Sequence, residues 1–439
     1  MSPTVWLQGL RERIPRAGYL VLWFLFVVYP FLVVPHGYSP LFLGRRLPPD
    51  YYYFPRFAVL LALALAALCI LLRERPRLRG ERALVALGAF LLFAFISTAL
   101  AAYPAVAWCG SPLRRTGFLT YLASSLLFLL ASTTLDEEKT ERLLGQAAAA
   151  AALVSLLALA QGWGLDLVPR DLYRERLQGF GTMAAPGFLG AYAAFFLPAA
   201  LARCLKAGRT SRILWLPVAC AVCAGVVASE ALFAWLAALA GLVLVAASAW
   251  RRPERRLPLG FALAALTAAA SGLLLARGVP WAGSPSLLAV PVQPGGPTLG
   301  ELLYIVWPAC LQLFKCAWDF GIGPDHLVYA GISTLMGVVV DKARNIFLEV
   351  GVTMGAFALL AYLAFLSSFF RRPRSEQGLL LLAMVLVYLV QGFFSVEDPV
   401  LMPLFWTVLG AVLAVWRQAA PQAAGEECPA ASGARPAPG

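Results

Sequence analysis

The fold is decided by apolar stretches such as residues 231–250, which read ALFAWLAALAGLVLVAASAW and lead directly into Arg251 and Arg252. A run of 20 residues without a charge has the length that an α-helix needs to cross a hydrocarbon layer about 30 Å thick. Lipid offers no hydrogen-bond partners, so a spanning segment must satisfy its own backbone, and this run lacks the alternation of a barrel strand. The stretch therefore predicts a transmembrane helix.

Comparable stretches recur along most of the chain. Hydrophobic residues make up 61% of the 439 positions and charged residues only 13%, a balance that a water-soluble protein of this size would not show. The predicted fold class is an all-α integral membrane protein with about twelve transmembrane helices. We expect these helices at residues 18–34, 57–72, 83–101, 118–135, 143–162, 186–205, 213–228, 231–250, 257–276, 346–370, 378–394 and 402–416.

The distribution of lysine and arginine predicts the orientation. Basic clusters fall in alternate connections, and the positive-inside rule makes those connections and both termini cytoplasmic. The net charge of +12 therefore requires no nucleic-acid partner, and membrane lipids are the expected surroundings. No cleavable signal peptide is apparent, so we expect a multi-pass protein of the inner, or cytoplasmic, membrane. The clusters lie at residues 11–16, 73–82, 203–212, 251–256 and 371–374.

One outer connection is much longer than the others. Residues 1–276 hold the first nine predicted helices and residues 346–416 the last three, and residues 277–345 between them form a large extracytoplasmic loop. Loops of this length are usually functional. Within it, residues 302–318 have the apolar periodicity of an amphipathic or re-entrant helix at the outer membrane face. Residues 417–439, rich in Ala, Pro and Gly, predict a disordered cytoplasmic tail.

Arginines on the outer side run against the topological bias and are therefore candidate binding groups. Arg114 and Arg115 precede the fourth predicted helix, and Arg176 precedes the sixth. A guanidinium donates two parallel hydrogen bonds to a phosphate and stays charged at any relevant pH. These arginines suit a pyrophosphate head group, although snorkelling to lipid phosphates explains them equally well.

Other outer side chains are candidates for acid-base chemistry. Glu349 lies about one turn into the tenth predicted helix, where an ionisable group is costly and functional by default. His326, after the amphipathic stretch, is a candidate general base, whereas His36 is better explained as structural. Glu397, in the last outer turn, is expected to be a solvated structural carboxylate. Neither a metal cluster nor a cofactor-binding motif is present in the sequence.

Four motifs lie next to predicted helices. They are WCGSPLRRTG at 108–117, RLQGFGT at 176–182 with PGFLGAY at 186–192, the stretch 307–325 that ends in GIGPD, and DKARNIFLEV at 341–350, which runs on to a glycine at 355. Their order and spacing resemble the O-antigen ligase family of bacterial membrane proteins, which includes polysaccharide polymerases. The resemblance spans most of residues 108–410 and is closest to ligase-like members from Gram-positive bacteria.

The resemblance implies a GT-C-like ligase fold and a metal-independent glycosyltransferase without cofactors. Such an enzyme moves a glycan from an undecaprenyl-pyrophosphate carrier to an extracytoplasmic glycan or lipid acceptor. By matching position, Arg176 together with Arg114 or Arg115 would hold the pyrophosphate. The positive charge would stabilise the leaving group.

This chain departs from the family's pattern at four functional positions. Residues 185–187 replace an Asn-Pro-Asn, basic residues are missing near Leu303 and Leu232, and the fourth departure is at the catalytic histidine. The family has a histidine before the asparagine that matches Asn345, and this chain has Arg344 there.

A guanidinium cannot accept the proton of an acceptor hydroxyl. An active enzyme would then use Arg344 on the leaving group, with His326, Glu349 or another group as the base. The alternatives are a catalytically silent relative that binds lipid-linked glycan, a polysaccharide polymerase and, with less support, a transporter or flippase, for which we find no internal repeat.

Overall fold

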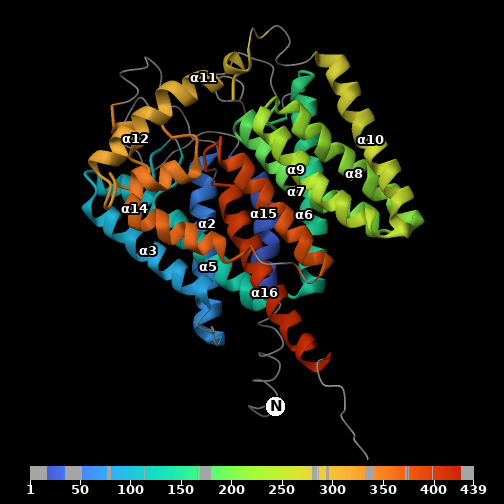
Figure 1. The fold of residues 1–439 in the computed structure, drawn as a ribbon, viewed down its shortest axis with the longest axis horizontal. Coiled ribbons are helices and arrows are strands. Elements are labelled where there is room, and N and C mark those ends of the chain that lie inside the picture. Colours follow the sequence, from blue (N-terminus) through green and yellow to red (C-terminus); the bar gives the residue numbers. More distant parts are fainter. Residues whose placement is uncertain are drawn as a thin grey trace, which may run out of the picture.

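A computed structural model describes residues 17–34, 52–76, 81–112, 114–165, 167–168, 179–278, 284, 286–292, 296–331, 340–370, 373, 375–397 and 399–426. Every regular element in these residues is a helix, and the long helices pack side by side into one bundle (Figure 1). Length and composition allow ten of the described helices to cross a membrane. The chain is a multi-pass helical membrane protein.

The predicted spans coincide with helices throughout. Nine of them match α2 (Tyr53–Glu74), α3 (Arg82–Leu100), α6 (Glu137–Gly162), α7 (Pro186–Lys206), α8 (Arg209–Ala228), α9 (Leu232–Trp250), α10 (Pro253–Arg277), α14 (Ile346–Ser367) and α16 (Leu401–Glu426). The other three match the shorter apolar helices Ala17–Phe31, which ends in η1 (Phe24–Val28) and η2 (Tyr29–Phe31), α5 (Phe118–Thr134) and α15 (Glu376–Gly392).

The predicted amphipathic helix of the large loop is present as a continuous run of three short elements. It comprises α11 (Leu299–Glu301), η4 (Leu302–Val306) and α12 (Trp307–Cys316), and it begins at a capping box between Thr298 and Glu301. The run is also the tenth helix long and apolar enough to span a membrane. In Figure 1 it crosses the upper edge of the bundle obliquely, above α14.

The helix α14 is broken, whereas the sequence predicts one continuous span over residues 346–370. Gly355 has φ 85°, and a Cβ there would lie 1.9 Å from the carbonyl oxygen of Asp319. An apolar pattern that runs through a glycine cannot reveal such a break. The helical hydrogen bonds lost at the break are replaced by the loop after α12, which packs against it: Ala356 N donates to Trp318 O, Ile322 N to Val352 O, and Gly323 N to Thr353 O.

The predicted disordered tail is wrong for its first ten residues, because α16 continues as a helix to Glu426. Alanine-rich sequence favours helix over coil. In addition, Arg417 Nε donates to Glu81 at 2.8 Å, and Arg417 also donates to the carbonyl oxygen of Ser132, which joins α16 to the ends of α3 and α5. The rest of the predicted tail, residues 427–439, lies outside the described residues.

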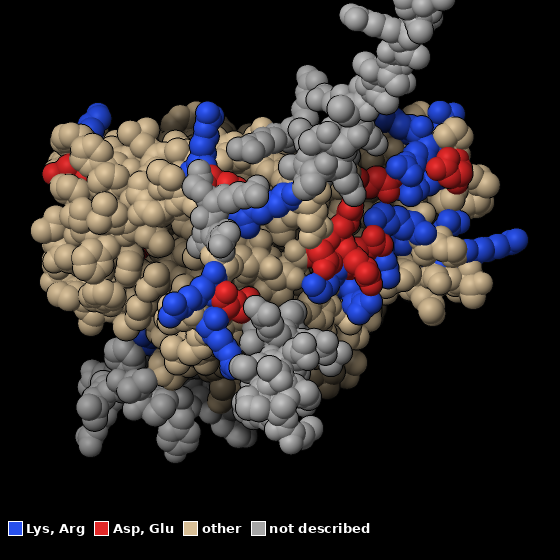
Figure 2. Space-filling view, turned by 90° about the horizontal axis from the view of Figure 1, so that it is seen from below, with Lys and Arg blue, Asp and Glu red and all other residues tan. Residues whose placement is uncertain are grey.

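The helix ends separate into two faces as the predicted topology requires. At the lower end of Figure 1, ion pairs join the start of α6 to the end of α7 and the start of α10 to the start of α15. Figure 2 shows this lower face, where Lys and Arg side chains surround a smaller group of acidic ones. At the upper end, the loops that precede α5 and α14 meet the loop that follows α12, and they form the candidate site.

Candidate functional site

Three loops meet at the upper end of the bundle. They are residues 101–117, which contain α4 (Pro104–Cys109), residues 317–331 after α12, and residues 340–345 before α14. Of the six described non-glycine residues with positive φ, three belong to these loops: Arg115 at 57°, Asp325 at 59° and Arg344 at 52°. Each such residue costs about 1 kcal/mol or more. Strained residues of this kind persist where the surrounding contacts hold them, and they cluster at functional sites.

A buried lysine holds the three loops together. Lys342 Nζ lies 2.7 Å from Asp325 Oδ1, 3.0 Å from Glu349 Oε1 and 2.8 Å from Thr116 Oγ1. Burial lowers the pKa of Lys342, but the charges of Asp325 and Glu349 more than offset this and raise that pKa above its ordinary value. Lys342 is therefore a permanent cation, only 3% exposed, at the centre of what we call the ion knot: Lys342, Asp325, Glu349 and Thr116.

Backbone groups complete the ion knot. Asp325 Oδ2 accepts hydrogen bonds from Ser111 N at 2.6 Å and Thr116 N at 3.3 Å. Glu349 Oε2 accepts from Ala343 N at 2.7 Å. Both oxygens of Glu349 are thus occupied, and its side chain is buried. The carboxylate that the sequence marks as a catalytic candidate holds the loop that carries Arg344.

Arg114 and Arg115 point to different places. Arg114 Nε donates to Asp341 Oδ2 at 2.5 Å, and its guanidinium lies 5.3 Å from the ring centre of Phe188 in the first turn of α7. Arg115 is buried and lies against Phe54 of α2, 5.4 Å from the ring centre. Of the two arginines that the sequence could not separate, Arg114 is the one that faces the loop before α14.

Asp341 pairs with Arg114, and its charge also acts on Arg344. Burial raises the pKa of Asp341, but the charge and hydrogen bond of Arg114, with the charges of Arg344 and Lys342, outweigh it and leave that pKa below its usual value. Asp341 is therefore ionised at neutral pH. The sequence motif contains Asp341 and Lys342, yet sequence reasoning assigned a role to neither; two adjacent charges before a membrane span were the available signal.

Arg344 is the side chain of the site with unused donors. It is partly exposed, and it makes no hydrogen bond or ion pair within 4 Å to the residues that the structure describes. Burial and the neighbouring charge of Arg114 lower the pKa of Arg344 to about 10, against the opposing effect of Asp341. The guanidinium is still charged at neutral pH. The two guanidinium groups of Arg114 and Arg344 carry one positive charge more than Asp341 neutralises. This part of the site is therefore net positive and suits an anion.

The other two catalytic candidates, Asn345 and His326, are engaged by backbone. Asn345 Oδ1 accepts from the amides of the first turn of α14, Phe347 N and Leu348 N, at 3.0 Å each. His326 Nδ1 lies 2.9 Å from Pro324 O, so that nitrogen must carry the hydrogen, and Nε2 accepts from Tyr103 N at 3.2 Å. His326 is also 3% exposed. Both residues hold local structure, and neither ring nitrogen of His326 faces the Arg114–Asp341 pair.

Arg176 and His36 lie outside the described residues, but the segment after Arg176 is fixed beside the site. Gln161 Oε1 accepts from the amides at positions 180 and 181. Arg56, 1% exposed, donates to carbonyl oxygens of the segment 30–32 and to that of Thr182. These contacts lead the chain into α7, where Phe188 contacts Arg114. Sequence reasoning missed Arg56, although a charge at the start of a span was visible.

An apolar groove of about 340 Å³ lies beside Asn345, the residue that follows Arg344. Its walls are α12, the first part of α14 and the residue after α15, and Asn345 lies at its edge. Trp307 Nε1 donates to Ala343 O at 3.1 Å, which fixes one wall to the loop of the site. The groove therefore lies next to the loop that carries Arg344. The wall side chains include Trp307, Leu311, Phe314, Phe347, Leu348 and Phe393.

Glu397 is buried, which corrects the expectation of a solvated turn. It is 3% exposed, and Tyr121 of α5 donates a hydrogen bond to its Oε2. Burial raises the pKa of Glu397 to about 7, because the charges of Glu349 and Asp325 reinforce it and the effects of Tyr121 and Lys342 only partly oppose it. The partner at position 121 is too distant in sequence for the turn to reveal this environment.

Among the described residues, no group of three or more His, Cys, Asp or Glu side chains is placed to hold a metal ion. No family model matches the chain, and no curated protein matches it. The site's chemistry must therefore be argued from its own geometry.

Proposed function

We propose that this chain is an O-antigen ligase-like membrane glycosyltransferase, which moves a glycan from an undecaprenyl-pyrophosphate carrier to an acceptor at the upper end of the bundle. The observation that carries this proposal is a cationic loop next to an apolar groove: Arg114 pairs with Asp341, Arg344 lies within reach of their charges, and the following Asn345 lines the groove. A polyprenyl-linked pyrophosphate combines the same two properties in one molecule: a doubly anionic head and a long apolar tail.

In this reaction the bond between the sugar's anomeric carbon and the pyrophosphate oxygen breaks, and a bond to the acceptor oxygen forms. Negative charge grows on the departing pyrophosphate. Arg344, which donates no hydrogen bond to the described part of the chain, and Arg114 stabilise that charge in a site largely shielded from water. The polyprenyl chain lies in the groove between α12 and α14.

The acceptor hydroxyl must lose its proton as the new bond forms. His326 and Glu349 are both bound by other groups, so we assign the proton to Asp341. One of its oxygens receives Arg114, and the other makes no hydrogen bond among the described residues. The low pKa of Asp341 makes it a weak base, which fits a late proton transfer to a carboxylate already ionised.

The test is turnover by the purified protein in lipid nanodiscs, with an undecaprenyl-pyrophosphate oligosaccharide as donor and candidate glycans as acceptors. Loss of the lipid-linked glycan is measured for the wild type, Arg114→Ala and Arg209→Ala, the last an exposed lower-face control. We expect Arg114→Ala to lose turnover by about 100-fold and Arg209→Ala to keep it. Turnover that survives in Arg114→Ala contradicts the assignment of the head-group site. A product that grows by repeated units identifies a polymerase instead of a ligase.

A second candidate is a catalytically silent relative that binds the same carrier. The observation that favours it is that His326 and Glu349, the two other acid-base groups, are both locked in structural contacts. Binding of the carrier without turnover would select this candidate. Arg344→His then decides its origin: transfer that appears in the variant identifies a degenerate transferase.

A further inference from the structure

The lower end of the bundle, opposite the candidate site, holds a second cluster of charges. Glu141 of α6 pairs with Arg203 at 2.6 Å and Lys206 at 2.8 Å, both from α7. Glu376 of α15 pairs with two arginines at the start of α10, Arg252 at 2.5 Å and Arg255 at 3.1 Å. Four cations share two carboxylates, so the cluster has an excess of positive charge.

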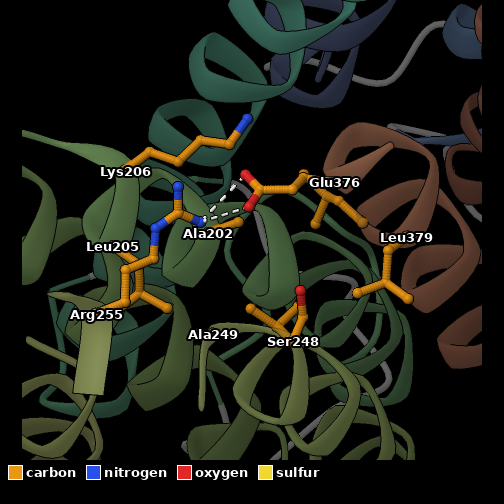
Figure 3. A pocket seen from close by; sticks show the side chains of 10 residues that line it. Ala202, Leu205, Lys206, Ser248, Ala249, Arg255, Glu376 and Leu379 are labelled. Atoms are coloured by element: carbon orange, nitrogen blue, oxygen red, sulfur yellow. Dashed lines mark hydrogen bonds and ion pairs between the residues drawn. The ribbon is translucent and has the colours of Figure 1, made fainter. Parts of the chain in front are cut away.

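The cations of this cluster have donors to spare. Arg255 uses one terminal nitrogen for both oxygens of Glu376. Figure 3 shows its other terminal nitrogen turned away from Glu376, on the side of Lys206. Among the described residues, Lys206 donates one hydrogen bond, to Glu141, although it has three N–H groups. Lys206 and Arg255 both line one cleft. No residue that the structure describes accepts their remaining hydrogens.

A buried amide next to the cleft lacks partners. Gln377 is 1% exposed, and neither its side-chain nitrogen nor its side-chain oxygen makes a hydrogen bond to the residues that the structure describes. A buried polar group left unsatisfied costs about 1–3 kcal/mol, so such a group in a folded protein calls for a water or a ligand. Gln377 lines a small cavity with Arg203 and Lys206, and Lys206 also lines the cleft of Figure 3.

The cleft has apolar walls beneath its charged rim. Leu205, Val245 and Leu379 line it together with Lys206 and Arg255. The two cavities measure about 30 Å³ and 10 Å³, which is room for water and not for a head group. A phosphate would therefore sit at the rim, between Lys206 and Arg255, with a water behind it that reaches Gln377.

We propose that the rim of this cleft binds the phosphate of an anionic membrane phospholipid, whose acyl chains stay in the surrounding bilayer. A phosphate diester accepts several charge-assisted hydrogen bonds and neutralises the excess charge. Because the cleft lies at the ends of helices long and apolar enough to span a membrane, lipid phosphates are the anions nearest to it. This site is independent of the proposed transfer reaction at the upper end.

The experiment measures the melting temperature in nanodiscs of phosphatidylcholine, with and without phosphatidylglycerol, and counts retained lipids by native mass spectrometry. We expect phosphatidylglycerol to raise the melting temperature of the wild type and to remain bound. Arg255→Gln should lose most of this increment, whereas Arg209→Gln, the same charge change at an exposed position on the same face, should keep it.

A second variant leaves all charges in place. Gln377→Leu removes the unsatisfied amide, so in phosphatidylcholine alone it should melt at the same or a higher temperature, which shows that it folds, while its phosphatidylglycerol increment shrinks. Equal increments in Arg255→Gln and Arg209→Gln would reduce the effect to general surface charge. An increment from inorganic phosphate alone would identify a soluble anion, and no increment in any disc would leave only water. Each of these three results overturns the proposal.

Discussion

The two ends of the bundle use the same kinds of side chain in opposite ways. At the upper end, Lys342 and its carboxylates are at most 7% exposed, and they join loops. At the lower end, the paired side chains are 20–47% exposed, and they join helix ends. Buried pairs cost much when one partner is lost, whereas exposed pairs contribute little. The comparison teaches that the upper charges specify loop geometry, whereas the lower charges only join helix ends.

The largest expected effect comes from removal of the buried cation at the upper end, and removal of a cation at the lower end is the matched control. Lys342→Met leaves two buried carboxylates uncompensated and should lower the free energy of unfolding by about 3–5 kcal/mol. Lys206→Met removes an exposed partner of Glu141 and should cost about 1 kcal/mol or less. Unfolding in detergent micelles, followed by tryptophan fluorescence, measures both. Similar losses in the two variants would erase the distinction between the ends.

A smaller effect is expected at the break in α14, which supports the upper loops. Gly355→Ala places a methyl group against the backbone of Asp319 at positive φ, and the combined strain and clash should cost about 2–4 kcal/mol. Gly260→Ala, in the peripheral helix α10 with no atom within 4 Å of the new Cβ, should be neutral or stabilising by up to about 1 kcal/mol. The same unfolding assay compares them, and equal stability would argue that α14 is continuous.

Glu397 should make the stability of the upper end depend on pH. Its pKa is about 7 in the folded protein and near 4.5 when unfolded, so between these values the folded state binds more protons. Stability therefore falls as pH rises through this window, by about 1.4 kcal/mol per unit and about 3 kcal/mol in total. Glu397→Gln should flatten the profile between pH 4.5 and 7. Parallel profiles for variant and wild type would show that the carboxyl is ionised throughout.

The smallest effect is expected for His326. If its ring holds Tyr103 N and Pro324 O, His326→Gln should reduce the free energy of unfolding by about 1 kcal/mol. The pH dependence of any transfer activity should be unchanged, because the imidazole does not exchange the proton of the reaction. A displaced pH profile, measured by turnover between pH 5.5 and 8.5, would return His326 to the role of base.

The sequence predicts the helices well, because an apolar run of bilayer length has few other stable structures. It also marks Arg114 and Glu349, since charges on the outer side or inside a span need an explanation. It could not separate Arg114 from Arg115, because that depends on the left-handed backbone of Arg115.

Three other features needed the structure for the same physical reason. The break at Gly355 depends on the loop after α12, and the burial of Glu397 depends on Tyr121 in α5. The ion knot around Lys342 joins the loop that holds Thr116 to two loops more than 200 residues later in the chain. Contacts between distant segments set each of these environments, and periodicity and local composition do not encode them.

The most direct test of the account is equilibrium binding of two carriers that differ in one phosphate. The purified protein, in nanodiscs, is titrated with undecaprenyl pyrophosphate and with undecaprenyl monophosphate, for the wild type and Arg344→Ala. We predict that the wild type binds the pyrophosphate at least about tenfold more tightly and that Arg344→Ala loses this preference while it unfolds like the wild type. Equal affinity of the wild type for both carriers, or a preference that survives in Arg344→Ala, would contradict the central claim.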